Sequence, residues 1–254
     1  MKSFFRLLVL PFLLTVAFAA IASGQQIHIK ARFLEVPKTA LDLLKPLSEF
    51  TNGIAILSAA SSQKLLHALE SKPGFETLAE PEVITISGRQ VEMRSTQIIN
   101  VVTNFSFQET GTNGSIVPQA EPVETGPILD TIPNVLSDGY TIDLRTTASL
   151  TEFLGYDQPP TNAVGEVTSN SNVHLPVVLP SLRGRKASAH VKLYDGQTLA
   201  LYKFSTNASG MQNQPKQDEK QLLVLVTVTL VDPAGNRIHT DDEMPFAKDA
   251  IPPQ

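Results

Sequence analysis

Three short turns that end in glycine divide much of this chain into strand-like runs. They lie at Ser87-Gly88, Ser137-Asp138-Gly139 and Asp195-Gly196, and apolar and polar residues alternate beside them. Glycine favours such turns because it adopts a positive φ at little cost. Alternation with a period of two is typical of half-buried strands. We therefore predict β-hairpins at all three positions, with Gly88, Gly139 and Gly196 as structural turn residues rather than catalytic ones.

The N-terminus has the pattern of a secretory signal peptide. Lys2 and Arg6 precede an apolar run. Ala20-Ile21-Ala22 fits an A-x-A cleavage site, and Ala22-Ser23-Gly24 is a second option. The run is short for a membrane-spanning helix, and Pro11 interrupts it. We predict a signal peptide over residues 1–24 and an exported mature chain.

Composition excludes several classes of protein. The 254 residues include no Cys, so disulfides, thiolate metal sites and a thiol nucleophile are excluded. Loss of the signal peptide removes two basic residues and no acidic one, which shifts the formal charge from −5 to −7. An acidic exported chain is a poor nucleic-acid binder, so we expect no nucleic-acid partner. Packing, strand pairing or oligomerisation must hold it together.

The first part of the mature chain predicts strand, helix, strand, helix. Gln26–Val36 alternates as a half-buried strand, and Leu41–Leu47 has a short helical pattern. Gly53–Leu57 is apolar enough for a second strand. Ser58 can cap a second helix over Ala59–Ser71.

The remainder predicts almost only strands joined by long loops, so the fold class expected for the whole chain is β-rich α+β. Strands are expected at Val83–Ile86, Val91–Arg94, Ile98–Phe107, within Gly126–Phe153 and Lys186–Phe204, and at Gln221–Asp232. Loops are expected at Thr110–Glu124, Gly155–Val173 and Asn207–Lys220, because these stretches are rich in Gly, Pro, Asn, Ser or Thr. From Pro233 onward the chain is polar and acidic, which predicts a frayed tail over 233–254.

No motif of catalysis or of metal or cofactor binding stands out. The five His show no metal-ligand spacing, and we expect them to be solvated. The chain lacks a G-x-S-x-G elbow and a phosphate-binding glycine loop. Arg183–Lys186 is a small basic cluster that could face anionic head groups or a loop surface. We therefore expect no enzyme, no cofactor and no metal; a secreted hydrolase is the weakest alternative.

Taken in order, five segments resemble the core domain of the secretins, the outer-membrane channels of bacterial type II and type III secretion and of type IV pili. The resemblance spans most of the mature chain, with the core domain placed at 25–232. The similar segments, some with Asp-Gly or Asp-Gly-Gln-Thr turns, lie at 27–36, 68–94, 126–153, 191–201 and 222–233. The resemblance implies a mixed β core whose long strands contribute to a multisubunit barrel, so that the predicted turns belong to a barrel wall.

The resemblance also implies partners and a location. We expect a homo-oligomer that contacts outer-membrane lipid and proteins of a secretion or pilus machine, in the outer membrane or periplasm of a Gram-negative-type bacterium. The terminal strand is the candidate wall strand, with Val224, Val226 and Val228 as the residues to test. We expect a short version of the family, without the gate segment and the preceding ring domains of full-length secretins. A soluble periplasmic assembly module without a pore is therefore the alternative.

Overall fold

The computed structural model describes residues 24–39, 53–110, 113–156, 165–166, 174–175, 180–209, 220–240, 244 and 250–254. The signal peptide, except for its last residue, and the helix expected at Leu41–Leu47 lie outside these residues. The described part consists mainly of strands, with one helix near the N-terminal end. The predicted β-rich α+β class is therefore confirmed.

The first sheet has the strand order β2-β12-β14-β1-β3, and β4 also pairs with β1. β1 and β14 pair antiparallel along their whole length. The bounds of its strands are β1 (Gln26–Pro37), β2 (Ile54–Leu57), β3 (Glu76–Ala79), β4 (Glu82–Ile86), β12 (Thr198–Leu201) and β14 (Lys220–Val231).

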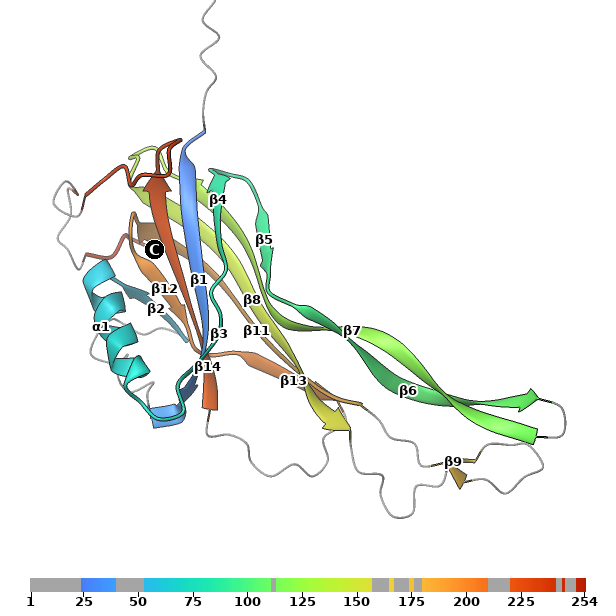
Figure 1. Ribbon diagram of the computed structural model, residues 1–254. Helices are drawn as coiled ribbons and strands as arrows, with labels where there is room; N and C mark the ends of the chain where they lie inside the picture. Colours follow the sequence, from blue (N-terminus) through green and yellow to red (C-terminus); the bar gives the residue numbers. More distant parts are fainter. Residues whose placement is uncertain are drawn as a thin grey trace, which may run out of the picture.

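The second sheet has the order β13-β11-β8-β7-β5, and β6 also pairs with β7. Four of its strands are long, and the hairpin of β6 and β7 projects well beyond the two packed sheets (Figure 1). The bounds are β5 (Val91–Arg94), β6 (Gln97–Thr110), β7 (Asn113–Val135), β8 (Thr141–Tyr156), β11 (Pro180–Tyr194) and β13 (Ser205–Ser209). A separate pair joins β9 (Gly165–Glu166) to β10 (His174–Leu175).

The two sheets pack face to face around the main core. Alternate residues of β1, among them Ile27, Ile29 and Phe33, face the second sheet and are fully buried. Leu129 of β7 and Leu144 of β8 are buried against them from the other side. Period-two alternation thus fixes which face of each strand enters the sandwich.

A second core lies between the first sheet and the helix α1 (Ala59–Glu70). The predicted cap is confirmed, because Ser58 Oγ accepts a hydrogen bond from the Ser61 N–H at 3.3 Å. Leu65 and Leu69 pack on the outer face of the sheet, on which Leu225 of β14 also lies. β14 is apolar on both faces because each face of it is covered.

Two of the three predicted hairpins are wrong. At Gly88 the chain passes from β4 in the first sheet to β5 in the second, and at Gly196 it passes from β11 in the second sheet to β12 in the first. Only at Gly139 do the flanking strands, β7 and β8, pair with each other. The residues of a turn determine only the local backbone. Strands of both sheets bury one face against the same core, so apolar and polar residues alternate in the same way in each. Their sequences therefore do not identify the partner strand.

The loop predicted at Thr110–Glu124 is also wrong, because β7 begins at Asn113. Its first half pairs only with β6 among the described residues, so one edge of this segment is open. Pro118 and Pro122 are tolerated there, since an edge strand need not donate every N–H. The loops expected at Gly155–Val173 and Asn207–Lys220 lie largely outside the described residues.

Candidate functional site

The projecting hairpin of β6 and β7 has an apolar outer face. Thr125, Pro127 and Leu129 point inward and are buried, so the even-numbered residues of β7 lie on the outer face of the sheet. Their partners on β6 share that face, and Ile98 is 73% exposed. We call the following residues the apolar band: Ile98, Val102, Phe105, Pro118, Ala120 and Pro122. Beyond Glu124, the partner of Ile98, only Asn100 is polar among the paired residues of this outer face whose side chains are described.

The opposite face of the hairpin carries polar side chains near the middle of β6. Asn104 pairs with Gln119 there, and both are exposed, as is Glu121. A β-bulge lies between Val102 and Asn104. One extra residue in β6 reverses its alternation relative to β7, which brings Phe105 onto the apolar face. The same face also carries Val101, Val117 and Val123, so the hairpin is amphipathic chiefly around Asn104 and Gln119.

An ion-pair cluster closes the apolar band at the base of the hairpin. On the same outer face, Arg94 Nη1 lies 2.8 Å from a carboxylate oxygen of Glu124 and also pairs with Glu92. Hydrogen bonds from Thr96 and Arg94 lower the pKa of Glu124 below its ordinary value. The outer face thus changes from apolar to charged at the Ile98–Glu124 pair.

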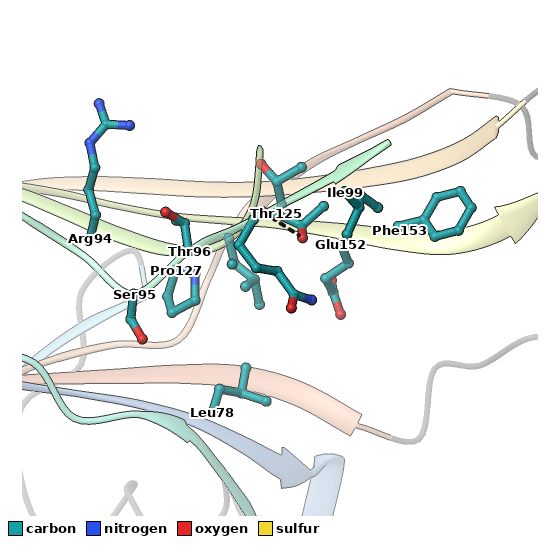
Figure 2. Close-up of a pocket in the computed structure, with 13 residues that line it drawn as sticks. Leu78, Arg94, Ser95, Thr96, Ile99, Thr125, Pro127, Glu152 and Phe153 are labelled. Carbon is teal, nitrogen blue, oxygen red and sulfur yellow. Dashed lines mark hydrogen bonds between the residues drawn. The ribbon is translucent and has the colours of Figure 1, made fainter. Parts of the chain in front are cut away.

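A cavity of about 630 Å³ opens where the hairpin leaves the sheet (Figure 2). Gly126 marks the fork with φ +121°, and a side chain there would meet Ser95 O at 2.5 Å. Leu78 and Phe153 line the cavity with polar residues. Its two charged lining residues, Arg94 and Glu152, are already ion-paired. Neither charged side chain of the cavity is therefore available as a reactive group.

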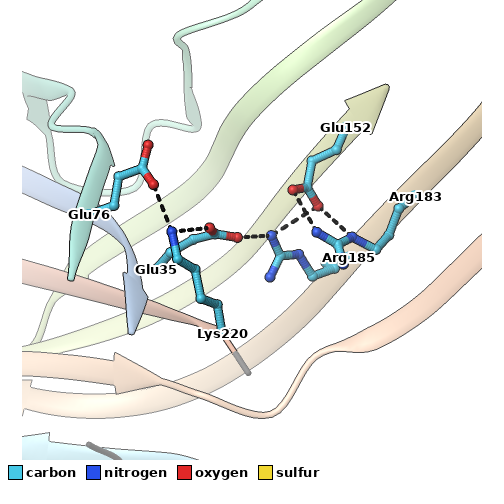
Figure 3. A network of polar contacts seen from close by, with 6 residues as sticks. All are labelled: Glu35, Glu76, Glu152, Arg183, Arg185 and Lys220. Carbon is cyan, nitrogen blue, oxygen red and sulfur yellow. Dashed lines mark hydrogen bonds and ion pairs between the residues drawn. The ribbon is translucent and has the colours of Figure 1, made fainter. Parts of the chain in front are cut away.

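A network of six charged residues joins the two sheets next to this fork (Figure 3). Arg185 of β11 is central: its Nη2 lies 2.6 Å from Glu35 of β1 and 2.9 Å from Glu152 of β8. Arg183 forms two hydrogen bonds of 2.9 Å with Glu152. Lys220 extends the network to Glu76 of β3.

The network is most buried at its centre. The side chain of Arg185 is 8% exposed and that of Glu35 is 13% exposed, whereas Lys220 is 42% exposed. Three basic and three acidic groups balance in charge. Because buried charges are costly unless they are paired, we expect this arrangement to favour one relative position of the two sheets.

A comparison of the sequence with protein-family models identifies the family. The family model described as "Secretin: Bacterial type II and III secretion system protein" matches residues 68–202, more than half of the chain. The chain belongs to the secretin family. No curated protein matches the sequence.

The chain is also similar to solved secretin structures at low identity. The type II secretin GspD from enteropathogenic Escherichia coli is 13% identical, with a TM-score of 0.38 over 84% of this chain and 71% of that chain. The Vibrio cholerae type IV competence pilus secretin PilQ is 10% identical, with a TM-score of 0.37 over 82% and 61%. The secretin in the ETEC pilotin–secretin complex AspS–GspD is 12% identical, with a TM-score of 0.37 over 84% of this chain and 51% of that chain. This secretin chain therefore spans between about half and 71% of those chains.

The residues predicted for structural roles in this secretin lie at turns and in the core. Gly88, Gly139 and Gly196 have φ values of +80°, +77° and +84°. The candidate wall valines of β14, Val224, Val226 and Val228, are fully buried between the sheets. Their side chains face the core because β14 is an inner strand of the first sheet. A place for β14 in a barrel wall stays a prediction, but the long strands belong to the other sheet.

The basic cluster Arg183–Lys186 is split by strand alternation. Arg183 and Arg185 point into the network between the sheets, whereas Lys186 is exposed. The alternative of a loop surface is therefore wrong, whereas contact with anionic head groups stays a prediction. The signal was present in the sequence, because Arg183, Arg185 and Ala187 share one face of a strand. Glu35 likewise lies on the odd-numbered face of its strand, which is otherwise apolar.

The Asp195 side chain of the Asp195-Gly196 turn links the turn to β14 and to the segment after it. Asp195 is buried, and its carboxylate accepts a hydrogen bond from the Leu230 N–H at 2.7 Å. Its other oxygen lies 3.0 Å from His239 Nδ1. Burial raises the pKa of Asp195 above its ordinary value, against the effect of these contacts.

The frayed tail expected from Pro233 is wrong for residues 233–240 and 250–254. Ile238 donates its N–H to Leu230 O at 3.0 Å, and Gln197 donates to Ala250 O at 2.7 Å. The segment is polar but its groups find partners on the turn, so composition alone misjudged it. His239, expected to be solvated, is instead packed against Tyr140 with a ring separation of 4.5 Å.

Among the described residues, no group of three or more His, Asp or Glu could hold a metal ion. Nor is any described helix long and apolar enough to span a membrane.

Proposed function

We propose that this secretin forms an oligomeric channel in the outer membrane, to which each subunit contributes the long strands β6, β7, β8 and β11. The observation that carries the proposal is the apolar band on the outer face of the hairpin. Transmembrane barrels alternate apolar-out and polar-in, and a strand of about 9–11 residues crosses the bilayer. β6 has 14 residues, which is long enough to cross.

The charged cluster at the base of the band supports this orientation. Arg94, Glu92 and Glu124 lie where the apolar outer face ends. Charges are strongly disfavoured within the hydrocarbon region and far less so at the interface. The cluster would therefore mark the membrane boundary, with the sandwich on the periplasmic side.

Open sheet edges support assembly with further copies. Within the described residues, β6 pairs only with β7, and β13 pairs only with β11. Each side of the second sheet therefore ends in a strand with one unpaired edge. Open edges invite pairing, and a head-to-tail ring closes all of them. We further propose export through the signal peptide at 1–24 and partners in a secretion or pilus machine; family membership supports both.

The first test compares two neighbouring residues on opposite faces of β7. Ala120→Lys puts a charge near the middle of the apolar band, where it should cost about 2–4 kcal/mol. Gln119→Lys puts the same charge on the polar face and serves as the matched control. Both positions are exposed, so neither change should unfold the chain.

The readout is the native mass, by light scattering, of detergent-extracted and salt-washed protein. A large ring found only in the detergent fraction, reduced by Ala120→Lys and unaffected by Gln119→Lys, supports the channel. A monomer or dimer released by salt would sink the proposal and favour the soluble assembly module. Equal loss of the ring in both variants would refute the assignment of the apolar band to lipid.

A further inference from the structure

The edge of β11 that points away from β8 is only partly covered by the described residues. β13 pairs with its first part, from Leu182 to Lys186. Residues 250–254 reach its last part, where the Gln254 carboxamide accepts from the Lys192 N–H and donates to Lys192 O, both at 3.0 Å. Between them, the backbone groups of Ser188 and His190 point to the same edge, because they share the parity of Lys192. No described strand pairs with these groups.

Gln254 makes the contacts that a neighbouring strand would make. A side-chain amide that binds both the N–H and the C=O of one residue reproduces one unit of a β-ladder. Lys192 Nζ adds a hydrogen bond of 3.0 Å to Pro253 O. The segment is anchored through Gln197 Nε2, which donates to Ala250 O at 2.7 Å. The edge contacts at Lys192 are exposed, so they can open without disturbing the core.

Strand direction identifies the partner that this edge fits. β5, β7, β8 and β11 are joined by antiparallel pairs, so β5 and β11 run in opposite directions. A second copy, rotated about a ring axis without being inverted, therefore offers its β5 antiparallel to β11. The Ser95 N–H bonds to β7, so the backbone groups of Glu92 and Arg94 point to the open edge of β5.

Charge along the two edges is complementary. The β5 edge carries Glu92 and Arg94, with Glu124 beside them on the same face, so two acidic groups accompany one basic group. On β11, Lys186 and Lys192 lie on the same outer face of the sheet. Opposite charges on facing strands favour pairing between copies and disfavour pairing of β11 with β11.

We propose that residues 250–254 form an edge cap, which competes with β5 of a second copy for β11, and that assembly requires the cap to leave Lys192. The proposal rests on the ring proposed above. Both occupants need the Lys192 N–H and C=O, so only one can bind at a time. The cap would protect an open edge of the unassembled chain from pairing indiscriminately.

The test uses the full chain with Gln254→Ala, and with Gln25→Ala as the control. Gln25 is exposed, and no side-chain contact of it is described. Loss of two hydrogen bonds should speed hydrogen exchange at the Lys192 amide and lower the concentration for half-assembly by about threefold to tenfold. Ser188→Pro removes an outward N–H at a tolerated edge position, and should abolish assembly without unfolding the chain.

The outcomes separate the cap from the ring. Unchanged exchange at Lys192, or assembly that is unchanged or weaker in Gln254→Ala, overturns the cap and leaves the ring standing. Normal assembly of Ser188→Pro also overturns it, because β11 is then not the shared edge. A wild-type chain that stays monomeric at all concentrations overturns the ring, and the competition with it.

Discussion

Replacement of Arg185 by Met tests whether the buried ion network holds the two sheets together. Arg185 lies between Glu35 and Glu152, and the three side chains are 8%, 13% and 22% exposed. Met keeps much of the volume but removes the positive charge. Both carboxylates then lose a partner in a site with little access to water.

The structure sets the magnitude of the effect. Breaking a buried ion pair from one side typically costs about 3–5 kcal/mol. Glu152 keeps its two hydrogen bonds to Arg183, whereas Glu35 keeps only Lys220, at 3.7 Å and half exposed. An exposed partner of this kind contributes little. We therefore expect Arg185→Met to lower the free energy of unfolding by about 3 kcal/mol, the low end of that range.

Urea unfolding followed by circular dichroism measures the change, with the m-value checked for constancy. Arg94→Met is the matched control, because Arg94 is 49% exposed and its pairs should contribute less than about 1 kcal/mol. Adding Glu35→Gln to Arg185→Met should recover part of the lost free energy of unfolding, since it removes the buried carboxylate charge that has no close partner. Equal effects of Arg185→Met and Arg94→Met, or no recovery in the double variant, would refute the reasoning.

Two further predictions concern the core and the turn. Val226→Asp places an unpaired charge in the fully buried core and should cost about 3–5 kcal/mol, seen as loss of folded monomer before any assembly; a folded, stable variant would contradict the core placement. The buried Asp195 has a raised pKa, so its contribution to stability is full below the unfolded pKa and is lost as pH rises through the folded pKa. Between pH 4 and 7 the wild type should therefore lose stability relative to Asp195→Asn, by about 1.4 kcal/mol per unit of raised pKa, and parallel pH profiles in urea melts would argue against it.

Local chemistry explains what the sequence predicted correctly. The cap at Ser58 depends on a side chain and a backbone N–H three residues apart. Strand positions follow from alternation, which both sheets of the sandwich require. The secretin resemblance also depended on the order of such local segments, and the family match over 68–202 agrees with it.

Long-range pairing decided the remainder. Gly88 and Gly196 have the backbone of a tight turn, yet each joins strands of different sheets, which the turn residues do not encode. The polar segment before Glu124 is strand because β6 pairs with it along its length.

The same reason applies to the candidate site. Arg185 meets Glu35 across 150 positions of sequence, and Gln254 meets Lys192 across 62. The sequence determined which side chains are available and which face of a strand they share. Only the tertiary structure decided which strands lie side by side, because that choice depends on contacts between segments far apart in the chain.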